Sequence, residues 1–472
     1  MSKVNNIFQS LSFFDWVVFI TVLMVTFLAV LYGHKLKNKE EKEENHILEL
    51  LLMGRRLTLP LFVSTLVATW YGGIFGVTQI AFEKGLYNFL TQGVFWYIAY
   101  LIFAFFIVDR MASYKAITLP DLVGKLFGPK ASKLSALFNF FNVLPIAYVI
   151  SLGLFLKILF GGPLILMMAF GILVVILYSI WGGLRAVVFS DLIQFVVMCG
   201  SVALILFFSI GTYGGLDFLL KSLPESHFSL TGGESLGVTL VWGFIALSTL
   251  VDPNFYQRCF AAESPKVAKK GILISTCIWV LFDLCTTFGA MYARAVMPEA
   301  DSGQAYIIYA LQVLPDGLKG FVLAGILATI LSTLDSYLFL AGTTISYDLL
   351  PNRFRNRKWA HYFGVLGVGI LSLILAELFQ GNVKTVWKTL GSYSAACMLF
   401  PVLFAYIFPK KIGDGQFVFG CLMGVIMVTY WRNWPPKGFL EGMDEFYMGL
   451  IATGFGILFY PLIDQLKKKI FS

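Results

Sequence analysis

The chain of 472 residues is 58% hydrophobic and only 13% charged, and its mean hydropathy of +0.80 excludes a soluble globular domain. Its net charge of +8 does not indicate nucleic-acid binding, because the basic residues follow the alternating pattern of a membrane topology. Apolar runs of about 20 residues recur from end to end, which predicts an all-α polytopic membrane protein.

We expect thirteen transmembrane helices. The first lies near 13–33; it is too long for the apolar core of a signal peptide and lacks a small-residue cleavage site, so we expect it to be retained. The other predicted spans are 58–79, 91–109, 134–157, 162–181, 187–210, 235–252, 271–293, 320–347, 359–378, 385–408, 415–431 and 445–465. Segment 34–52 is typical of a cytoplasmic helix or linker, and segment 300–317 of a short external interfacial helix.

Basic residues alternate sharply between the gaps that separate the spans. About 25 of the 35 Lys and Arg residues lie on one side, including Arg185 and the segment Arg258–Lys270, and about 9 lie on the other. The positive-inside rule then places the N-terminus outside and the C-terminus in the cytoplasm, which requires an odd number of spans. We expect a multi-pass protein of the plasma membrane, which in a bacterium is the inner membrane.

Most other function classes find no support in the sequence. The six cysteines show neither metal-binding nor disulfide spacing, and the four histidines form no catalytic constellation. There is no Walker A motif, no redox motif and no large soluble domain, so we expect neither an enzyme nor an ATP-driven pump. We also expect no nucleic-acid partner and no obligatory protein partner. A membrane sensor or channel is an alternative, although the sequence has no kinase domain and no ring of pore-lining charges.

Two of the spans contain helix-breaking residues at membrane depth. The second span carries Gly72 and Gly73, and the seventh has Gly243 at its centre with Asp252 and Pro253 near its inner end. These spans lie five helices apart, and interrupted helices in corresponding positions of two halves indicate a transporter binding site. Unwinding frees backbone carbonyls for a cation. The alternative interpretation is close helix packing through small residues.

The ninth span combines an apolar helix with an unusual number of oxygen-bearing side chains. Its sequence VLAGILATILSTLDS (322–336) contains Thr329, Ser332, Thr333, Asp335 and Ser336. A carboxylate at membrane depth costs roughly 3 kcal/mol on insertion scales, so Asp335 is a functional candidate. Helical spacing places Ser332, Asp335 and Ser336 on one face. This cluster predicts a site that takes a small hard cation out of water.

Several linked motifs resemble the sodium:solute symporter family over nearly the whole chain. They are GRRLTLP (54–60) leading into LVATWYGG (66–73), GGLRAVVFSDLIQ (182–194), DPNFYQRCFAA (252–262) and ATILSTLDS (328–336). The resemblance implies the leucine-transporter fold, with two inverted five-helix repeats (spans 2–6 and 7–11), one helix before them and two after. The expected divisions of the chain are 1–57, 58–210, 211–408 and 409–472.

The resemblance also implies a sodium site between the second and ninth spans. On this chain it would use the backbone carbonyls of Ala68, Tyr71 and Thr329 and the hydroxyls of Ser332 and Thr333. Sodium is a hard cation that prefers oxygen ligands, and neutral oxygens can bind it without trapping it. The alternative interpretation is that both hydroxyls only bond back to carbonyls of their own helix.

Some family members have a second sodium site, whose pattern maps here to Ser332, Asp335, Ser336 and Asp191. Position 335 departs from the serine that we would expect in members that bind two ions. Asp335 could therefore strengthen a second sodium site, accept a proton or pair with a basic residue. If the Asp191 and Asp335 carboxylates are close together, their repulsion requires either a protonated carboxyl or a cation between them.

In the family fold, the solute lies near the membrane midplane against the interrupted helices. The candidate solute residues are Thr69, Trp70, Gly72, Gly73, Asn139, Asn142, Trp242, Phe244, Ser248, Asp283, Trp387, Ser392 and Tyr393. Each aromatic residue taken alone is also compatible with simple packing. Asp283, in the middle of a span, could hold a polar or zwitterionic solute.

The sequence therefore predicts a sodium-coupled secondary active symporter that imports a small polar organic solute by alternating access. Its expected partners are sodium, this solute and the lipid bilayer. An alternative hypothesis keeps the fold and couples transport to protons at Asp335 or Asp191.

Overall fold

The computed structural model describes residues 11–40, 46–354, 357–380, 383–436 and 444–471. Within these ranges every regular element is helical, and the only β-type pairing is an isolated bridge between Leu57 and Ala262. The α-helices are α2 (Phe13–Glu40), α3 (His46–Leu52), α4 (Leu59–Ala68), α5 (Ile74–Lys84), α6 (Leu86–Asn88), α7 (Phe95–Ile102), α8 (Val108–Ala112), α9 (Leu119–Leu126), α10 (Pro129–Asn142), α11 (Ile146–Phe160), α12 (Leu164–Tyr213), α13 (Leu216–Ser222), α14 (Leu236–Ala246), α15 (Pro253–Ala261), α16 (Pro265–Val296), α17 (Ala305–Val313), α18 (Leu318–Thr343), α19 (Lys358–Leu378), α20 (Val383–Ile407), α21 (Asp414–Asn433) and α22 (Glu445–Phe471). The 3₁₀ segments are η2 (Met53–Arg55), η5 (Glu225–Phe228), η6 (Leu247–Val251) and η8 (Asn352–Phe354), and the π segments are η3 (Phe89–Val94), η4 (Phe103–Ile107) and η7 (Thr344–Leu349).

Ten helical stretches of the described chain are long and apolar enough to cross a membrane. Three shorter apolar helices are Leu59–Ala68, Leu164–Leu177 and Ala396–Ile407. The structure therefore confirms an all-helical chain with about ten membrane-spanning candidates, and every predicted span overlaps a helix or a pair of helices. The exact number of crossings stays a prediction.

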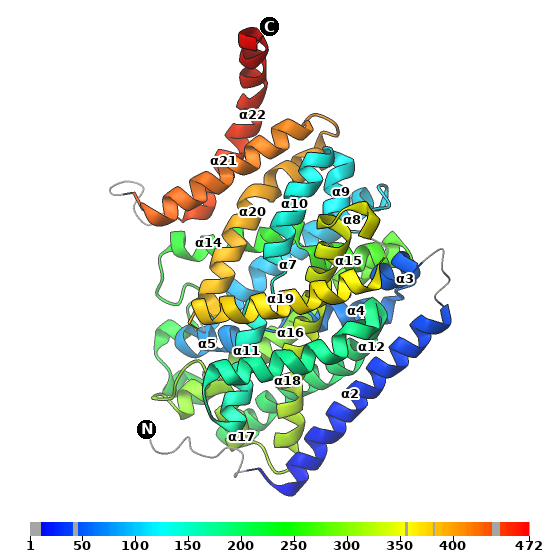
Figure 1. The fold of residues 1–472 in the computed structure, drawn as a ribbon. Coiled ribbons are helices and arrows are strands. Elements are labelled where there is room, and N and C mark those ends of the chain that lie inside the picture. Colours follow the sequence, from blue (N-terminus) through cyan, green and yellow to red (C-terminus); the bar gives the residue numbers. More distant parts are fainter. Residues whose placement is uncertain (1–10, 41–45, 355–356, 381–382, 437–443, 472) are drawn as a thin grey trace.

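Helix α18 lies at the centre of the molecule. It packs against α12, α2, α19 and α11, and almost all of its side chains are buried. Helix α2 flanks this centre on one side, whereas α21 and α22 lie at the opposite end of the molecule against α20 (Figure 1). Helix α18, which carries the predicted ion residues Thr329, Ser332, Thr333, Asp335 and Ser336, is therefore internal, and the first and last helices are peripheral.

The predicted span 134–157 contains a break that the apolar pattern did not reveal. Helix α10 ends at Asn142 and α11 begins at Ile146. Proline lacks a backbone N–H and disfavours helical conformation in the residue before it, which explains the interruption at Pro145. The break determines which side chains at the end of α10 reach the middle of the protein.

The seventh predicted span, 235–252, also differs from expectation. Helix α14 continues through Gly243 and gives way to a 3₁₀ turn at Leu247. Asp252 then caps α15: its Oδ1 accepts hydrogen bonds from the backbone N–H groups of Asn254 (2.8 Å) and Phe255 (3.3 Å). The interruption therefore lies at the Asp-Pro pair rather than at the glycine, and the helix continues past the predicted end to residue 261.

The predicted spans 162–181 and 187–210 form one element, α12, which turns at Gly183. This glycine has φ 61° and ψ −171°, a conformation that residues with a side chain rarely adopt. After the turn, α12 runs beside α4 and α18 and brings Asp191 into the centre of the molecule.

Segment 300–317 forms the helix that we predicted, but in a different setting. Tyr306 and Tyr309 of α17 are buried, and the helix packs against α16, α5 and α18. Much of this helix is therefore buried against the protein. The predicted cytoplasmic segment 34–52 contains the end of α2 and all of α3; residues 41–45 lie outside the described residues.

A buried ion pair between Glu49 and Arg185 connects α3 to the turn in α12. Arg185, which we counted among loop residues, is 5% exposed, and its Nε and Nη2 each lie 2.7 Å from Glu49 Oε1. We expect Glu49→Ala to lower the free energy of unfolding by about 3–5 kcal/mol, because it removes one partner of a buried ion pair. Thermal unfolding of the purified protein in detergent measures this loss.

The control is Asp316→Ala, which removes a pair with Lys319 at 2.7 Å in which the aspartate is 62% exposed. An exposed pair contributes only about 0–1 kcal/mol. Equal stability of the two variants would contradict the role of Glu49.

Candidate ion and solute sites

The second predicted span consists of two half-helices that meet beside α18. Helix α4 ends at Ala68 and α5 begins at Ile74, so the chain is unwound around Gly72, as predicted. A Cβ atom on Gly72 would lie 2.5 Å from Thr333 Cβ and 2.6 Å from Tyr148 Cδ1. Because these distances leave no room for a side chain, glycine is what allows the unwound backbone to approach α18.

The five predicted sodium ligands lie where this break meets α18. Ser332 Oγ is 2.7 Å from Ala68 O and 3.3 Å from Thr329 O, and Thr333 Oγ1 is 3.1 Å from Thr329 O. Tyr71 lies within the unwound segment itself, and all five residues are buried. Residues about 260 positions apart in the sequence thus present their oxygen atoms to one another.

The two hydroxyls also bond back to their own helix, as the alternative interpretation expected. Ser332 Oγ donates to Ala328 O at 2.8 Å, and Thr333 Oγ1 donates to Thr329 O. A hydroxyl oxygen that donates its proton keeps two lone pairs as an acceptor. Back-bonding and binding of a cation are therefore compatible, and the oxygens are of the neutral type that suits a hard cation held reversibly.

The residues predicted for a second cation divide between two places. Asp335 Oδ1 accepts a hydrogen bond from Ser179 Oγ at 2.9 Å, and Asp335 lines an apolar cavity of about 250 Å³ beside α2. Asp191 and Ser336 instead lie around the side chain of Arg258.

Arg258 is a functional candidate that the sequence analysis missed. We counted it among cytoplasmic loop residues, but α15 carries it into the interior, where it is 1% exposed. Its Nη2 lies 2.6 Å from Thr69 Oγ1 and 2.8 Å from Ser336 Oγ. The same nitrogen lies 3.3 Å from Thr65 Oγ1 and 3.9 Å from Asp191 Oδ2. One guanidinium thus joins α4, α12, α15 and α18 beside the predicted sodium ligands.

A cavity of about 160 Å³ lies between the two interrupted spans. The predicted solute residues in its wall are Trp70, Gly73, Asn142, Trp242 and Ser248. They come from both interrupted spans and from the end of α10, so the wall combines elements that are distant in the sequence.

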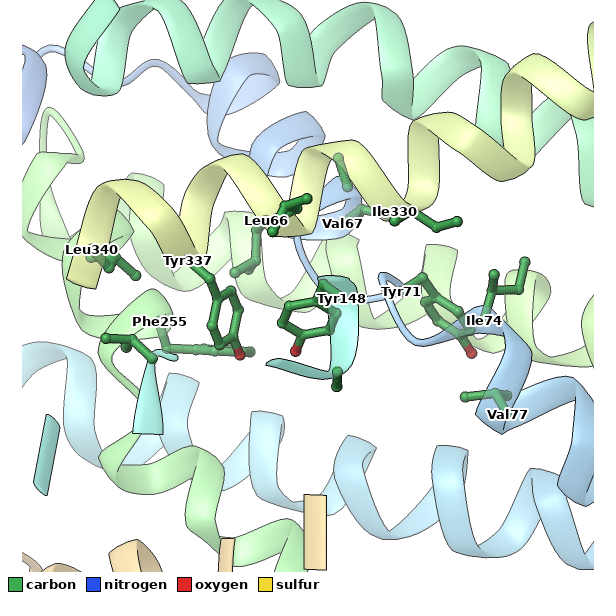
Figure 2. Packing of buried hydrophobic residues seen from close by; sticks show 14 of the residues in the cluster. Leu66, Val67, Tyr71, Ile74, Val77, Tyr148, Phe255, Ile330, Tyr337 and Leu340 are labelled. Atoms are coloured by element: carbon green, nitrogen blue, oxygen red, sulfur yellow. The ribbon is translucent and has the colours of Figure 1, made fainter. Parts of the chain in front are cut away.

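The wall also contains aromatic and polar residues that we did not select as solute residues. The rings of Tyr71, Tyr148 and Tyr337 lie in a row below α18, with their hydroxyls on the side facing away from that helix (Figure 2). Gln92 and Trp96 come from the third predicted span, where the π segment η3 shifts the helical register. The uniformly apolar sequence of this span does not reveal such a shift in helical register.

The other predicted solute residues do not belong to the described cavity wall. They are Thr69, Gly72, Asn139, Phe244, Asp283, Ser392 and Tyr393. Asn139 Nδ2 donates to Thr344 Oγ1 at 2.7 Å, and Asn139 lies one helical turn before Asn142, which does line the cavity. The ring of Phe244 packs on Tyr447 of α22 at a centroid distance of 5.0 Å.

Three further predictions concern charged and aromatic residues on α16 and α20. The Asp283 carboxylate accepts a hydrogen bond from Tyr97 behind the cavity wall. The Tyr393 hydroxyl lies 3.0 Å from Thr429 Oγ1 on α21. The side chain of Trp387, another predicted solute residue, is not among those that the structure describes.

Comparisons with known proteins agree on one family. A profile of the sodium:solute symporter family matches residues 51–427. The high-affinity proline transporter PutP of Bacillus subtilis is 25% identical over 76% of this chain and 80% of its own. The sodium/glucose cotransporter of Vibrio parahaemolyticus is 23% identical over 98% of this chain and 93% of its own.

Among solved structures, a Na⁺-coupled sialic acid symporter in a substrate-bound outward-open state has the same fold. It matches with a TM-score of 0.79 at 17% sequence identity, over 96% of this chain and 98% of that one. The similarity covers nearly the whole chain and concerns the arrangement of the helices.

Proposed function

Because the chain belongs to the sodium:solute symporter family, we propose that sodium drives its import of a small polar organic solute by alternating access. The resemblance noted from the motifs is confirmed, and the chain is a multi-pass membrane protein of a transporter family. The observation that carries the proposal is the contact of Ser332 Oγ with Ala68 O, which joins α18 to the break between α4 and α5. A sodium ion there would tie these two elements together and so favour the state that holds the solute.

The proposed topology has thirteen crossings, with spans 2–6 and 7–11 as inverted repeats inside the divisions 58–210 and 211–408. The two breaks, α4–α5 and α14–α15, lie five spans apart and so support this arrangement. Segments 1–57 and 409–472 would supply the peripheral helices. We place the N-terminus outside and the C-terminus in the cytoplasm of the plasma membrane, on the strength of the basic residues.

We propose that the solute is neutral or positively charged and binds in the cavity between the breaks. The described wall carries the carboxylate of Asp252 and no Lys or Arg side chain, and the side chain of Lys388 lies outside the described residues. Three tryptophans, Trp70, Trp96 and Trp242, supply ring faces for an apolar or cationic part of the solute. A volume of about 160 Å³ favours a compact molecule.

The test begins with thermal unfolding of the purified chain against metabolite sets, in sodium and in potassium buffer. A bound solute raises the unfolding temperature by mass action. Uptake of the solute so identified is then measured in proteoliposomes under an inward sodium gradient. If uptake in sodium-free buffer under a pH gradient equalled uptake under the sodium gradient, transport would be coupled to protons and not to sodium.

We expect Gln92→Ala and Trp242→Ala each to weaken solute binding about tenfold, through the loss of about 1.4 kcal/mol of contact. Sodium-dependent stabilisation in the absence of solute should not change, because neither residue is among the proposed ion ligands. Solute titrations followed by thermal unfolding measure both effects.

The matched control is Asn139→Ala, since Asn139 was predicted as a solute residue but faces Thr344 and not the cavity. It should leave the affinity for the solute unchanged. A larger loss of affinity in Asn139→Ala than in Gln92→Ala would place the solute elsewhere.

A further inference from the structure

The connection between α12 and α14 lies against the end of α5. This loop, residues 214–235, contains α13 and the 3₁₀ segment η5, and η5 packs on α5 and α6. Within η5, the side chain of His227 is only 4% exposed. Loops usually run over the surface with their polar side chains in water, so a buried histidine indicates that the loop docks specifically on α5.

Two contacts fix His227 on the end of α5. Its Nε2 lies 3.1 Å from the backbone carbonyl oxygen of Phe82, in the last turn of the helix. Gly85, which follows α5, has φ 59° and ψ −125°, and a Cβ atom there would collide with the backbone carbonyl of His227. The loop and the end of the helix can therefore meet only because Gly85 has no side chain.

These contacts favour the neutral form of the imidazole ring. A carbonyl oxygen only accepts hydrogen bonds, so Nε2 of His227 carries the hydrogen that is donated to Phe82. The other ring nitrogen, Nδ1, is buried and has no hydrogen-bond partner among the described residues. A second proton would create a buried N–H group at Nδ1 without an acceptor, which is unfavourable as long as the loop stays docked.

The charges around the ring act in the same direction. Burial is the main cause that lowers the pKa of His227; the Phe82 carbonyl opposes this shift, and the guanidinium of Arg294 on α16 adds to it. The other titratable groups of the elements packed around η5 are Glu83 and Lys84 on α5, Tyr87 on α6, and Glu225 and Glu234 in the loop itself. None of these groups is hydrogen-bonded to the ring in the described structure, so no carboxylate there compensates a charged imidazole.

We propose that the loop 214–235 is a pH-sensitive latch on α5, which acidification of the medium on its side of the membrane releases by protonation of His227. That side is the external one in the proposed topology, and the inference does not depend on sodium coupling. Helix α5 is the second half of an interrupted span and contributes Val77 to the cavity wall. Release of its end would therefore allow this part of the wall to move about the unwound segment.

The direction of the pH dependence follows from the lowered pKa of His227. Above the ordinary histidine pKa of about 6.5, the ring is neutral in both the docked and the released loop, and docking is at full strength. As the pH falls below this value, protons bind first to the released loop, where the ring is in water. Docking is therefore weakened progressively in acid.

The experiment measures hydrogen–deuterium exchange of the purified full-length chain in detergent, at about pH 7.5 and about pH 5.5. Each rate is divided by that of the denatured chain at the same pH, which removes the intrinsic effect of pH on exchange. In the wild type, protection of residues 224–232 should fall at the lower pH by up to about tenfold, the limit set by a histidine pKa of about 6.5 in the released loop. His227→Gln can still donate to the Phe82 carbonyl but does not titrate, so its protection should be the same at both pH values.

The control is Glu234→Gln, which removes the ion pair of the same loop with Lys84 and keeps His227. It should lower protection at both pH values by the same factor and preserve the wild-type ratio between them; loss of that ratio would assign the response to Glu234 and overturn the inference. Unchanged protection of the wild type, or an equal acid response in His227→Gln, would overturn it as well. If His227→Gln does not fold, the wild type decides: a loss of protection confined to the loop and the end of α5 supports the latch, and a loss spread over the whole chain overturns it.

Discussion

The double substitution Ser332→Ala with Thr333→Ala is expected to abolish the stabilisation of the protein by sodium. At a sodium concentration of 100 times the dissociation constant, the wild type should gain about 2.7 kcal/mol. The double variant should gain nothing, because only backbone carbonyls remain of the five proposed oxygen ligands. The measurement is the difference between the thermal unfolding temperatures in sodium chloride and in potassium chloride of equal ionic strength.

The control pair is Ser151→Ala with Thr286→Ala. Both hydroxyls are buried and donate to a carbonyl four residues earlier in their own helix, as Ser332 and Thr333 do. They lie on α11 and α16, and neither is among the proposed sodium ligands. The control variant should therefore keep the full sodium response even if it is somewhat less stable. A sodium response in the Ser332/Thr333 variant equal to that of the control would exclude the proposed site.

The sequence predicted those features of the fold that depend on local pattern. Apolar segments of sufficient length indicated the membrane helices, and the glycines at 72 and 73 indicated the unwound segment between α4 and α5. The oxygen-rich face of α18 was recognised because burying polar groups at membrane depth is energetically unfavourable, so their presence there indicates a function. These features need only neighbouring residues for their interpretation.

The remaining features depend on contacts between distant segments. Arg258 was assigned to a loop because a basic residue after Asp252 and Pro253 is typical of a cytoplasmic boundary. In the structure, hydroxyls from α4 and α18 and a carboxylate from α12 stabilise the charge of Arg258 in the interior. These partners are distant in the sequence, so a local sequence pattern cannot predict them. The aspartate of α12 was itself predicted as an ion ligand, but its arginine partner was not.

The solute cavity was predicted only where it borders the interrupted helices. Trp70, Trp242 and Ser248 were selected because they lie on those helices, and they line the cavity. Gln92 was missed because the π segment that presents it leaves no periodic trace in a uniformly apolar span. Asn139 was predicted together with Asn142 because both lie on the fourth predicted span, and in the structure only Asn142 lines the cavity.

The break between α4 and α5 is expected to tolerate no side chain at Gly72. In Gly72→Ala, the added methyl group would stand 2.5 Å from Thr333 Cβ and 2.6 Å from Tyr148 Cδ1, so the unwound backbone must move away from α18. Overpacking of this kind costs about 1–3 kcal/mol in stability. The larger effect concerns function, because the shift separates the carbonyls of the unwound segment from the α18 hydroxyls.

Sodium-dependent stabilisation should therefore be lost in Gly72→Ala, together with sodium-driven uptake, while the protein still inserts and purifies as a folded chain. Gly367→Ala is the matched control, because Gly367 lies within α19 and a Cβ there would meet no atom within 4 Å. Alanine favours a helix over glycine by up to about 1 kcal/mol, so this variant should keep the sodium response at equal or higher stability. If Gly72→Ala also kept that response, close contact between the break and α18 would not be required for sodium binding, and the ligands would have to be sought on α18 alone.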